Sequence, residues 1–193
     1  MFKNKRMAMV GGLVLAVFLS LLILMVPGKA LAAYECWVKI RGMDGRDIQG
    51  ESTVKGKENL IEIISWSLGG YMPISPQSGL PSGKKIMKPL NLTMRTSKAS
   101  PPLMQALNTG MRLSVTLTAR KPGTSGDYLT ITLTEALVVS FVNLGNSKST
   151  EAYPIEELML TYKRMQIDYK PTMPDGSLGT PVIVIFDWEV PPA

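Results

Sequence analysis

The sequence contains no histidine and a single cysteine, Cys36, in 193 residues. Without histidine, the Ser-His-Asp and Cys-His catalytic arrangements are excluded, as are metal sites built on imidazole. One cysteine provides neither a thiolate zinc site nor a disulfide within the chain. We therefore predict that the protein is not an enzyme and that it has no catalytic residue, no metal site and no cofactor.

Carboxylate pairs of the kind used by glycosidases are the catalytic groups that the composition leaves open. Glu156 and Glu157 are adjacent, and adjacent residues of a strand point to opposite faces, so they form a poor pair. Asp187 and Glu189 share a face that alternates with aromatic residues, which favours a solvated outer surface over a site. Glu135 falls in the apolar phase of its strand, and we favour a structural role for it, either buried and paired or at a bulge.

Cys36 has two interpretations. As the odd cysteine of an exported protein, it could form a disulfide between two chains. It is also in phase with Tyr34, Val38 and Ile40, which favours a small apolar side chain of the core. The phase of the strand makes the core the preferred interpretation.

Excess charge is concentrated at the N-terminus. The formal net charge is +6, and residues 1–32 carry four cations and no acid. The rest of the chain, without the cations Lys3, Lys5, Arg6 and Lys29, has 17 basic and 15 acidic residues. A nearly balanced chain gives no support to a nucleic-acid partner, and we predict none.

The N-terminus has the pattern of a signal peptide. A basic start is followed by an uncharged apolar run over residues 7–26, and a proline and a glycine then break any helix. Ala30-Leu31-Ala32 fits the small-residue cleavage pattern, so we predict cleavage after Ala32, with Ala33 first in the mature chain. The alternative is an uncleaved anchor, because 20 apolar residues match the length that spans a bilayer. We expect a leader over residues 1–32, a membrane contact only if that leader stays attached, and one domain over residues 33–193.

The remainder of the chain alternates apolar and polar residues as half-buried strands do. The alternating segments are "YECWVKIR" (34–41), "LNLTMR" (90–95), "RLSVTLTAR" (112–120), "YLTITLTEALVVSFV" (128–142), "ELMLTYKRMQIDY" (157–169) and "VIVIFDWEV" (182–190). We expect seven or eight strands, with a β-bulge near Lys163 where the phase changes. From Ala136 onward the strand becomes apolar on both faces, which predicts a buried centre.

The alternation also predicts which side chains face inward. They are Tyr34, Cys36, Val38 and Ile40; Leu90, Leu92 and Met94; Leu113, Val115, Leu117 and Ala119; Leu129, Ile131 and Leu133; and Val182, Val184, Phe186, Trp188 and Val190. One segment, "SPPLMQALNTG", predicts a helix with Ser100 as N-cap and Gly110 as its left-handed stop. Many short strands with one lateral helix indicate a mainly β barrel or sandwich.

Five segments, in order, resemble the haemolysin-coregulated protein (Hcp) family, the tube protein of type VI secretion. They are "GESTVKGKENLIEIISWSLG" (50–69), "SKASPPLMQALNTG" (97–110), "DYLTITLTEALVVSFV" (127–142), and, within residues 162–188, "YKRMQIDYKP" and "DGSLGTPVIVIFDW". The resemblance spans nearly all of residues 34–190. It implies a β-barrel of two antiparallel sheets with one lateral helix.

The resemblance further implies a homohexameric ring, with rings that stack into a tube and a lumen that holds small cargo proteins. In the family, the long loop after the W-S-x-G strand projects and helps rings stack. Here that loop is residues 69–85. Its expected stacking residues are Gly69, Gly70, Tyr71, Met72, Pro73, Gly79, Gly83, Lys84 and Lys85.

The leader departs from the family, whose members are ordinarily loaded from the cytoplasm without a signal peptide. Three explanations remain: tubes that assemble outside the inner membrane, a stand-alone exported relative, or a misassigned start codon. We favour an exported ring or tube former, periplasmic or extracellular, with a homo-oligomer as partner. The alternative is a monomeric or membrane-anchored binding module on the same barrel.

Overall fold

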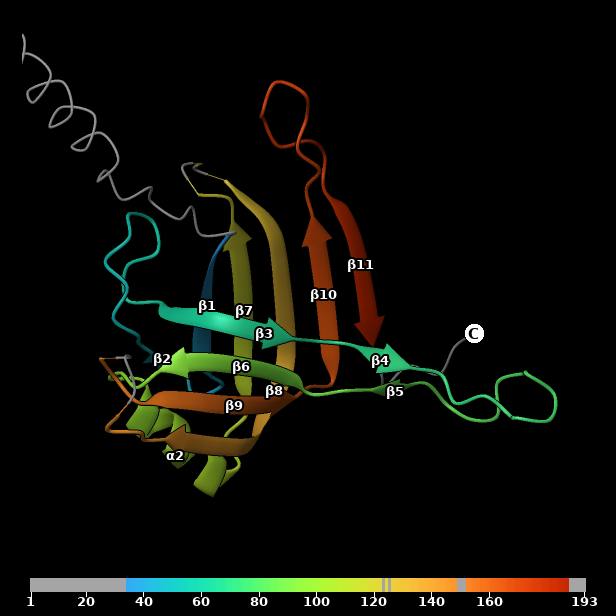
Figure 1. Cartoon of the computed structure of the whole chain (residues 1–193), viewed down its shortest axis with the longest axis horizontal. Coiled ribbons are helices and arrows are strands. Elements are labelled where there is room, and N and C mark those ends of the chain that lie inside the picture. Colours follow the sequence, from blue (N-terminus) through green and yellow to red (C-terminus); the bar gives the residue numbers. More distant parts are fainter. Residues whose placement is uncertain (1–33, 123, 125, 149–151, 188–193) are drawn as a thin grey trace, which may run out of the picture. The chain divides into compact units, whose positions relative to one another are not determined.

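Six antiparallel strands close into a barrel in the structure, a computed structural model that describes residues 34–122, 124, 126–148 and 152–187 (Figure 1). The strands are β1 (Glu35–Gly42), β3 (Ile61–Ser67), β6 (Leu90–Arg95), β7 (Leu113–Arg120), β8 (Asp127–Leu144) and β9 (Ile155–Thr161). The order runs β8-β7-β1-β3-β6-β9, and β9 pairs again with β8. The predicted mainly β barrel with one short helix at its side is confirmed.

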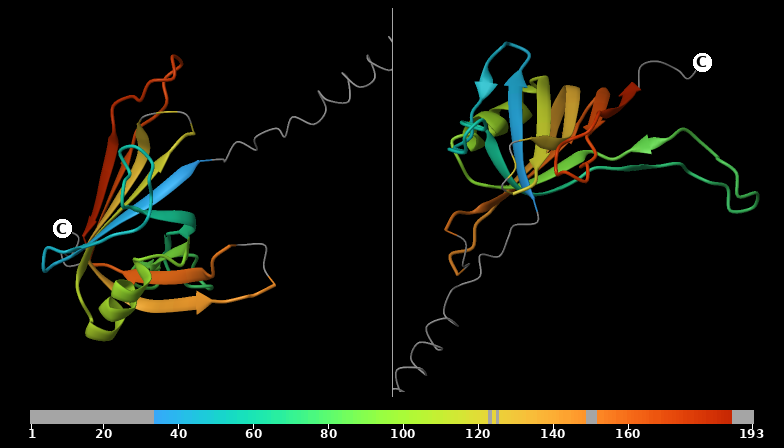
Figure 2. Two further views of the ribbon diagram at one scale, coloured as in Figure 1. Left: turned by 90° about the vertical axis from the view of Figure 1, so that its left-hand side faces the viewer. Right: turned by 90° about the horizontal axis from the view of Figure 1, so that it is seen from above.

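Strand β8 belongs to two sheets. Its first half pairs with β7 and with β10 (Arg164–Tyr169), which carries β11 (Val182–Asp187) on its far side. Its second half pairs with β9 in the barrel wall. Between the halves, Glu135 has φ of +52° and the β7–β8 register shifts, so the expectation of a bulge at Glu135 is confirmed. β10 and β11 therefore extend a sheet beyond the barrel (Figure 2).

The bulge predicted near Lys163 is wrong. Tyr162 and Lys163 lie between two separate strands, β9 and β10. The phase changes there because β9 pairs with the second half of β8, whereas β10 pairs with the first half. In the described residues, eight strands have six residues or more, which agrees with the seven or eight expected, and β2 (Asp47–Ile48), β4 (Gly70–Tyr71) and β5 (Ile86–Met87) have two residues each.

The barrel interior holds most of the side chains predicted to face inward. Those with 6% or less of their surface exposed are Cys36, Val38, Ile40, Leu90, Leu92, Met94, Leu113, Val115, Leu117, Ala119, Ile131 and Leu133. Tyr34 is exposed, which corrects its inward assignment, because it precedes the first residue of β1. Leu129 is half-buried; it lies near the start of β8, in the half of the strand that pairs with β7 and β10.

Trp37 is buried although the alternation of β1 places it on the outer face. Two cations cover its ring: Lys57 Nζ lies 5.4 Å from the ring centroid, and the Arg120 guanidinium carbon lies 4.7 Å from it. Lys57 comes from the loop between β2 and β3, so this loop packs against the outside of β1. Cation–π contacts of this kind are strongest where water is excluded.

Two apolar runs that were expected to be buried are exposed, the first of them only in part. In the second half of β8, Ala136 and Val138 are buried as expected, whereas Val139 and Val142 point outward, because this part of the strand forms barrel wall with one face toward solvent. In β11, the four residues 182–185 are each 45–60% exposed, so the predicted inward face of Val182 and Val184 is wrong. Phe186 of that face packs partly against the core, and Trp188, Glu189 and Val190 lie outside the described residues.

Helix α2 (Ser100–Thr109) packs against β8 at the side of the barrel (Figures 1 and 2). Prolines occupy its first turn, where no N–H donor is needed, and Gly110 ends it with φ of +62°, as predicted. The N-cap prediction is wrong by one residue. Ala99 is the N-cap, and Ser100 lies in the first turn, where its hydroxyl is used by a buried carboxylate.

Residues 69–88 leave the barrel as an extended hairpin, which we call the arm (Figure 1). Strands β4 and β5 pair at its base, and an isolated bridge joins Ile74 to Pro81 near its tip. In the part of the chain that the structure describes, no helix is both long enough and apolar enough to cross a membrane. The predicted signal peptide and the cleavage site at Ala32 and Ala33 lie outside the described residues.

Candidate functional site

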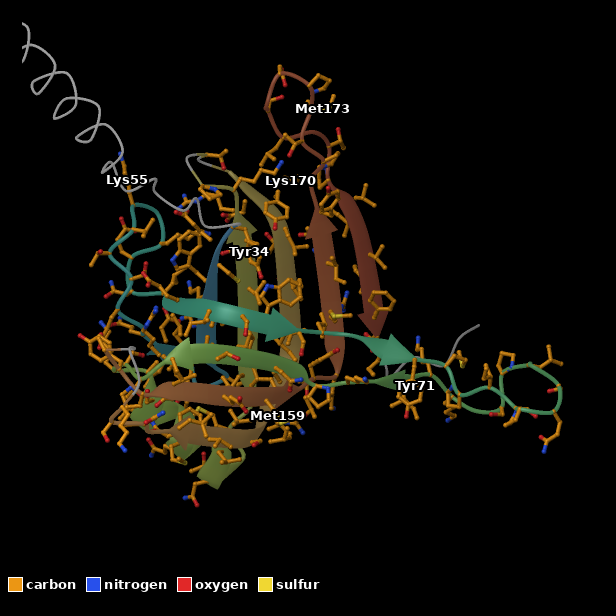
Figure 3. All side chains as sticks on the ribbon, viewed as in Figure 1. Tyr34, Lys55, Tyr71, Met159, Lys170 and Met173 are labelled. Atoms are coloured by element: carbon orange, nitrogen blue, oxygen red, sulfur yellow. The ribbon has the colours of Figure 1, made fainter. Side chains whose placement is uncertain are left out.

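The arm is an ordered hairpin with apolar side chains on its surface. Backbone N–H groups of Ser75, Ser82 and Lys88 donate to carbonyls of the opposite side at 2.8–2.9 Å, so the two sides are tied along their length. Its large apolar side chains that are 43–64% exposed are Tyr71, Met72, Ile74, Leu80 and Ile86. Tyr71 lies beyond the barrel in Figure 3. All nine residues expected in the stacking loop lie on this arm or at its root.

The charge of the arm has one sign. Between Glu62 and Asp127 the sequence has no acidic residue and eight basic ones. Lys84 and Lys85, on the returning side of the arm, are exposed. An exposed apolar hairpin with cations and no acids is a surface for a partner that supplies carboxylates or other anions.

Strand β11 is a second exposed apolar surface. Of the strands in the described residues, it pairs only with β10, so no described strand covers its other edge. Val182, Ile183, Val184 and Ile185 expose apolar surface on both faces of this edge. Proteins usually protect such an edge with charges, prolines or a covering segment. Four consecutive aliphatic residues near the end of the sequence were the signal that could have identified this surface.

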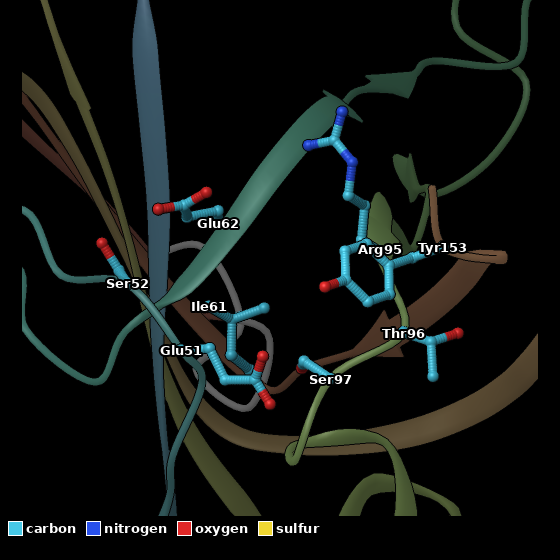
Figure 4. A pocket seen from close by; sticks show the side chains of 8 residues that line it. All are labelled: Glu51, Ser52, Ile61, Glu62, Arg95, Thr96, Ser97 and Tyr153. Atoms are coloured by element: carbon cyan, nitrogen blue, oxygen red, sulfur yellow. The ribbon is translucent and has the colours of Figure 1, made fainter. Parts of the chain in front are cut away.

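A pocket of about 210 Å³ lies at the end of the β3–β6 pair opposite to the arm (Figure 4). One wall comes from residues 51–52 and the start of β3, and the other from residues 95–97 and Tyr153. Glu51 and Glu62 are the acidic residues of the lining, and in Figure 4 their carboxylates lie on opposite sides of β3. No spacing in the sequence indicates this pocket, because its residues come from four separate segments.

Of the carboxylates considered as catalytic pairs, Glu156 and Glu157 are not brought together. Glu156 faces the interior, where it is fully buried and accepts hydrogen bonds from Ser100 Oγ at 2.7 Å and Asn143 Nδ2 at 2.8 Å, whereas Glu157 is exposed. Asp187 lies 4.0 Å from an arginine guanidinium on β10, and Glu189 is outside the described residues. Within the described ranges, no three His, Cys, Asp or Glu side chains converge to hold a metal ion.

Cys36 lies in the core, with 6% of its surface exposed, as the phase of its strand predicted. Burial raises the pKa of its thiol from 9.0 to about 12, and the nearby Lys57 cation lowers it by less than burial raises it. A protonated, buried thiol is unreactive toward oxidants and toward other thiols. The geometry therefore favours the core interpretation over a disulfide between chains.

The barrel, the side helix and the projecting arm are the features that the sequence resemblance predicted, and comparison with known proteins tests that resemblance. Residues 37–169 match the sequence profile of the family described as "Type VI secretion system effector, Hcp". The chain belongs to the Hcp family. It is 35% identical to protein hcp1 of Pseudomonas aeruginosa, with 75% of this chain and 90% of that protein aligned.

Further relatives of this Hcp-family chain agree with the assignment. It is 27% identical to the "Major exported protein" of Pseudomonas aeruginosa, over 76% of this chain and 86% of that protein. It superposes on the crystal structure of Hcp1 from Salmonella typhimurium with a TM-score of 0.66 and 25% identity, covering 82% of this chain and 97% of that one. By family and by fold, it is an Hcp-like type VI secretion protein.

Proposed function

We propose that this Hcp-family protein is an exported structural subunit that forms homohexameric rings, which stack into tubes. The observation that carries the proposal is β11, an open sheet edge with four aliphatic side chains 45–60% exposed. An apolar strand edge of this kind is an aggregation hazard unless a partner covers it. A neighbouring copy of the same chain is the partner that a ring supplies.

Two different surfaces must meet for a ring to form. No other strand of the described residues repeats the β11 edge, so this edge meets an unlike surface of the next copy in a head-to-tail contact. The exposed Val139, Val142 and Leu144 of β8 offer an apolar surface on the barrel wall for that contact. When the rotation between copies closes, such contacts give a ring with no free edge.

Stacking is the role that we propose for the arm. It projects from the barrel, its backbone hydrogen bonds hold it in one hairpin, and its exposed groups are apolar and cationic. The stacking residues that we propose are those within residues 69–85 that the family resemblance implies. A lumen that holds small cargo proteins and contacts with secretion-apparatus components are also part of this proposal.

Export through a leader is the third part of the proposal. A signal peptide over residues 1–32, cut after Ala32, would release the domain of residues 33–193 into the periplasm or the exterior. The relative named "Major exported protein" supports an exported location for the family, and the leader pattern supports the route. We propose a structural role without catalysis. It agrees with the opposite orientations of Glu156, which is buried, and Glu157, which is exposed, because such residues do not form a catalytic pair.

The proposal can be tested on protein that is expressed as the full chain and purified after export. Its mass is measured by native mass spectrometry, and its shape is imaged by negative-stain electron microscopy. We expect a species of six subunits, rings and a polypeptide that starts at Ala33. Ile183→Lys on β11 should convert rings to monomers, whereas Met43→Lys, at an equally exposed apolar residue on the β1–β2 turn, should leave them intact. If the wild-type protein stays a monomer at high concentration, the proposed ring is wrong and a monomeric binding module is favoured. If the full-length chain is recovered from the membrane, a membrane-anchored binding module is favoured.

A further inference from the structure

The outer part of the arm, residues 72–83, is uncharged. It contains no acidic or basic residue, and the isolated bridge from Ile74 to Pro81 lies within it. Its large apolar side chains are Met72, which is 47% exposed, Ile74, which is 62% exposed, and Leu80, which is 64% exposed. Leu80 and Ile74 expose a larger fraction of their surface than any other large apolar residue in the described part of the chain. The end of the arm therefore presents apolar surface to whatever it meets.

A tyrosine and two lysines lie directly behind this outer part. Tyr71 pairs with Ile86 across the two sides of the arm. Lys84 and Lys85 precede Ile86 on the returning side, and they are exposed, as is Tyr71. Four residues separate Leu80 from Lys84, which corresponds to roughly 13 Å along an extended strand. Segments that bind at a bilayer surface have this order, with apolar side chains at the acyl boundary and tyrosine and lysine at the level of the headgroups.

The backbone at the end of the arm leaves few donors to be separated from water. The Ser75 N–H donates to the Leu80 carbonyl at 2.8 Å, and the Ser82 N–H donates to the Pro73 carbonyl at 2.9 Å. The prolines of the outer part have no N–H. The Ser75 hydroxyl lies 3.1 Å from Gln77 Oε1, to which it donates a hydrogen bond. Such a turn is suited to the polar–apolar boundary of a bilayer, where some water remains, rather than to its hydrocarbon centre.

Another copy of the chain can cover the apolar groups of the arm, but it supplies few anions for Lys84. Six acidic residues of the described ranges already form ion pairs with cations of their own chain: Glu35, Asp44, Asp47, Asp127, Glu135 and Asp187. A surface of anionic lipids carries unpaired phosphates above an apolar layer. It therefore matches the charge and the apolar side chains of the arm together.

We propose that the end of the arm inserts into the surface of an anionic lipid bilayer, with Ile74 and Leu80 at the acyl boundary and the Lys84 ammonium among the phosphates. The contact goes beyond the proposed function, because a single subunit can make it. It also adds a membrane contact to the one that the sequence predicted for the leader alone. In a stack of rings, the arms of the last ring meet no further ring, and several arms on one ring would bind together with increased avidity.

A fluorescent probe at the end of the arm tests the insertion directly. Leu80→Cys protein is labelled with a dye whose emission shifts to the blue in an apolar environment; Cys36 is buried and stays unlabelled. The full-length protein is mixed with vesicles of phosphatidylcholine alone, or of phosphatidylcholine and phosphatidylglycerol in equal parts. We expect a blue shift with the anionic vesicles and binding at least tenfold weaker to the neutral ones. The dye reports on the arm whether or not the leader is attached.

The same label at Thr109→Cys is the matched control, because Thr109 is an exposed residue at the far end of α2. Its emission should not change with either kind of vesicle. Identical emission from the Leu80→Cys label with and without anionic vesicles would overturn the proposal. An equal blue shift at both labelled positions would also overturn it, because the arm would then have no special contact with the lipid.

Substitutions in the labelled Leu80→Cys protein separate the charge from the apolar contact. A charge near an anionic bilayer changes affinity by about fivefold, so Lys84→Glu should weaken vesicle binding by about tenfold or more. Lys39→Glu, at an exposed lysine of β1, is its control and should have little effect. Ile74→Ser should reduce the blue shift, whereas Met43→Ser, at a residue of nearly equal exposure, should leave it unchanged. Equal effects of each variant and its control would contradict the assignment to the arm.

The outcome is distinguishable from failure of the ring. Native mass spectrometry of the same protein follows the hexamers. Hexamers whose labelled arm does not respond to anionic vesicles would overturn the bilayer contact and leave the ring in place. A monomer whose labelled arm does respond would overturn the ring and leave the bilayer contact in place.

Discussion

Glu135 Oε2 lies 3.1 Å from Arg112 Nη1, at the bend where β8 passes from the outer sheet into the barrel wall. The same carboxylate oxygen lies 3.3 Å from Lys163 Nζ. Arg112 directly precedes β7, and Lys163 lies between β9 and β10. One carboxylate, on a residue with φ of +52°, therefore ties three segments together at the bend.

Substitutions at Glu135 should separate the ion pairs from the backbone strain. Glu135→Ala removes both partly exposed ion pairs and keeps a side chain in the left-handed region, so we expect a loss of about 1 kcal/mol in the free energy of unfolding. Glu135→Gly removes the same pairs but relieves about 1 kcal/mol of strain, so it should be close to neutral. Urea denaturation measures both variants. A glycine variant less stable than the alanine variant would contradict this account of the bend.

The Lys57–Asp127 pair should stabilise the loop that covers Trp37. Lys57 Nζ lies 2.6 Å from Asp127 Oδ2 and 2.9 Å from Thr118 Oγ1, and the lysine side chain is 9% exposed. Lys57→Met leaves a largely buried carboxylate without its cation, for which we expect a loss of about 2–3 kcal/mol.

Lys55→Met, at an exposed lysine of the same loop, is the matched control and should change stability by less than about 0.5 kcal/mol. Tryptophan fluorescence during denaturation follows the surroundings of Trp37. Equal stabilities for Lys57→Met and Lys55→Met would show that the pair contributes little.

Cys36 gives the barrel a defined dependence on alkaline pH. The folded pKa, about 12, lies above the unfolded value of 9.0, so the unfolded chain releases the thiol proton first. The thiol's contribution to stability is therefore complete below pH 9 and is lost as the pH rises from 9 toward 12. Cys36→Ala should flatten the fall of unfolding free energy over this interval. In the native protein at pH 8, the thiol should not react with a disulfide reagent until denaturant is added, and rapid reaction would contradict the burial.

Glu156 should be replaceable by an amide but not by a small residue. Glutamine retains one acceptor oxygen for Asn143 Nδ2, and its amide NH2 can donate to the Ser100 hydroxyl, which turns to accept, so we expect Glu156→Gln to cost about 1 kcal/mol or less. Alanine leaves both donors unsatisfied beside a cavity, and we expect a loss of about 3 kcal/mol. Glu157→Ala, on the outer face of the same strand, is the control and should be nearly neutral. A large loss with Glu156→Gln would show that the negative charge itself is required.

Strict alternation made much of the barrel predictable. Leu113, Val115 and Leu117 are buried because each second residue of a barrel strand faces the interior, and the sequence alternates accordingly. The end of α2 was equally predictable, since a glycine at the left-handed position is a local signal. The projecting loop followed from the resemblance, together with its glycines and prolines.

Features that depend on distant segments escaped prediction. Trp37 occupies an outward position of β1, and only the loop that carries Lys57 buries it. The change of phase at Lys163 looked like a bulge because local pattern does not show which half of β8 each flanking strand pairs with. The apolar run of β11 indicated burial, which a single subunit does not provide. The pocket beside Glu62 combines four segments, and no spacing in the sequence indicates it.

The continuity of β8 has a mechanical consequence. Its 18 residues run from the outer sheet into the barrel wall without a linker, so the two halves of the subunit share one covalent strand. A force along the strands that acts on β11 is opposed by whole rows of antiparallel hydrogen bonds along β10 and β8, which must break together. A subunit built in this way transmits a push or a pull as a rigid block, a property suited to a particle that is moved as one piece.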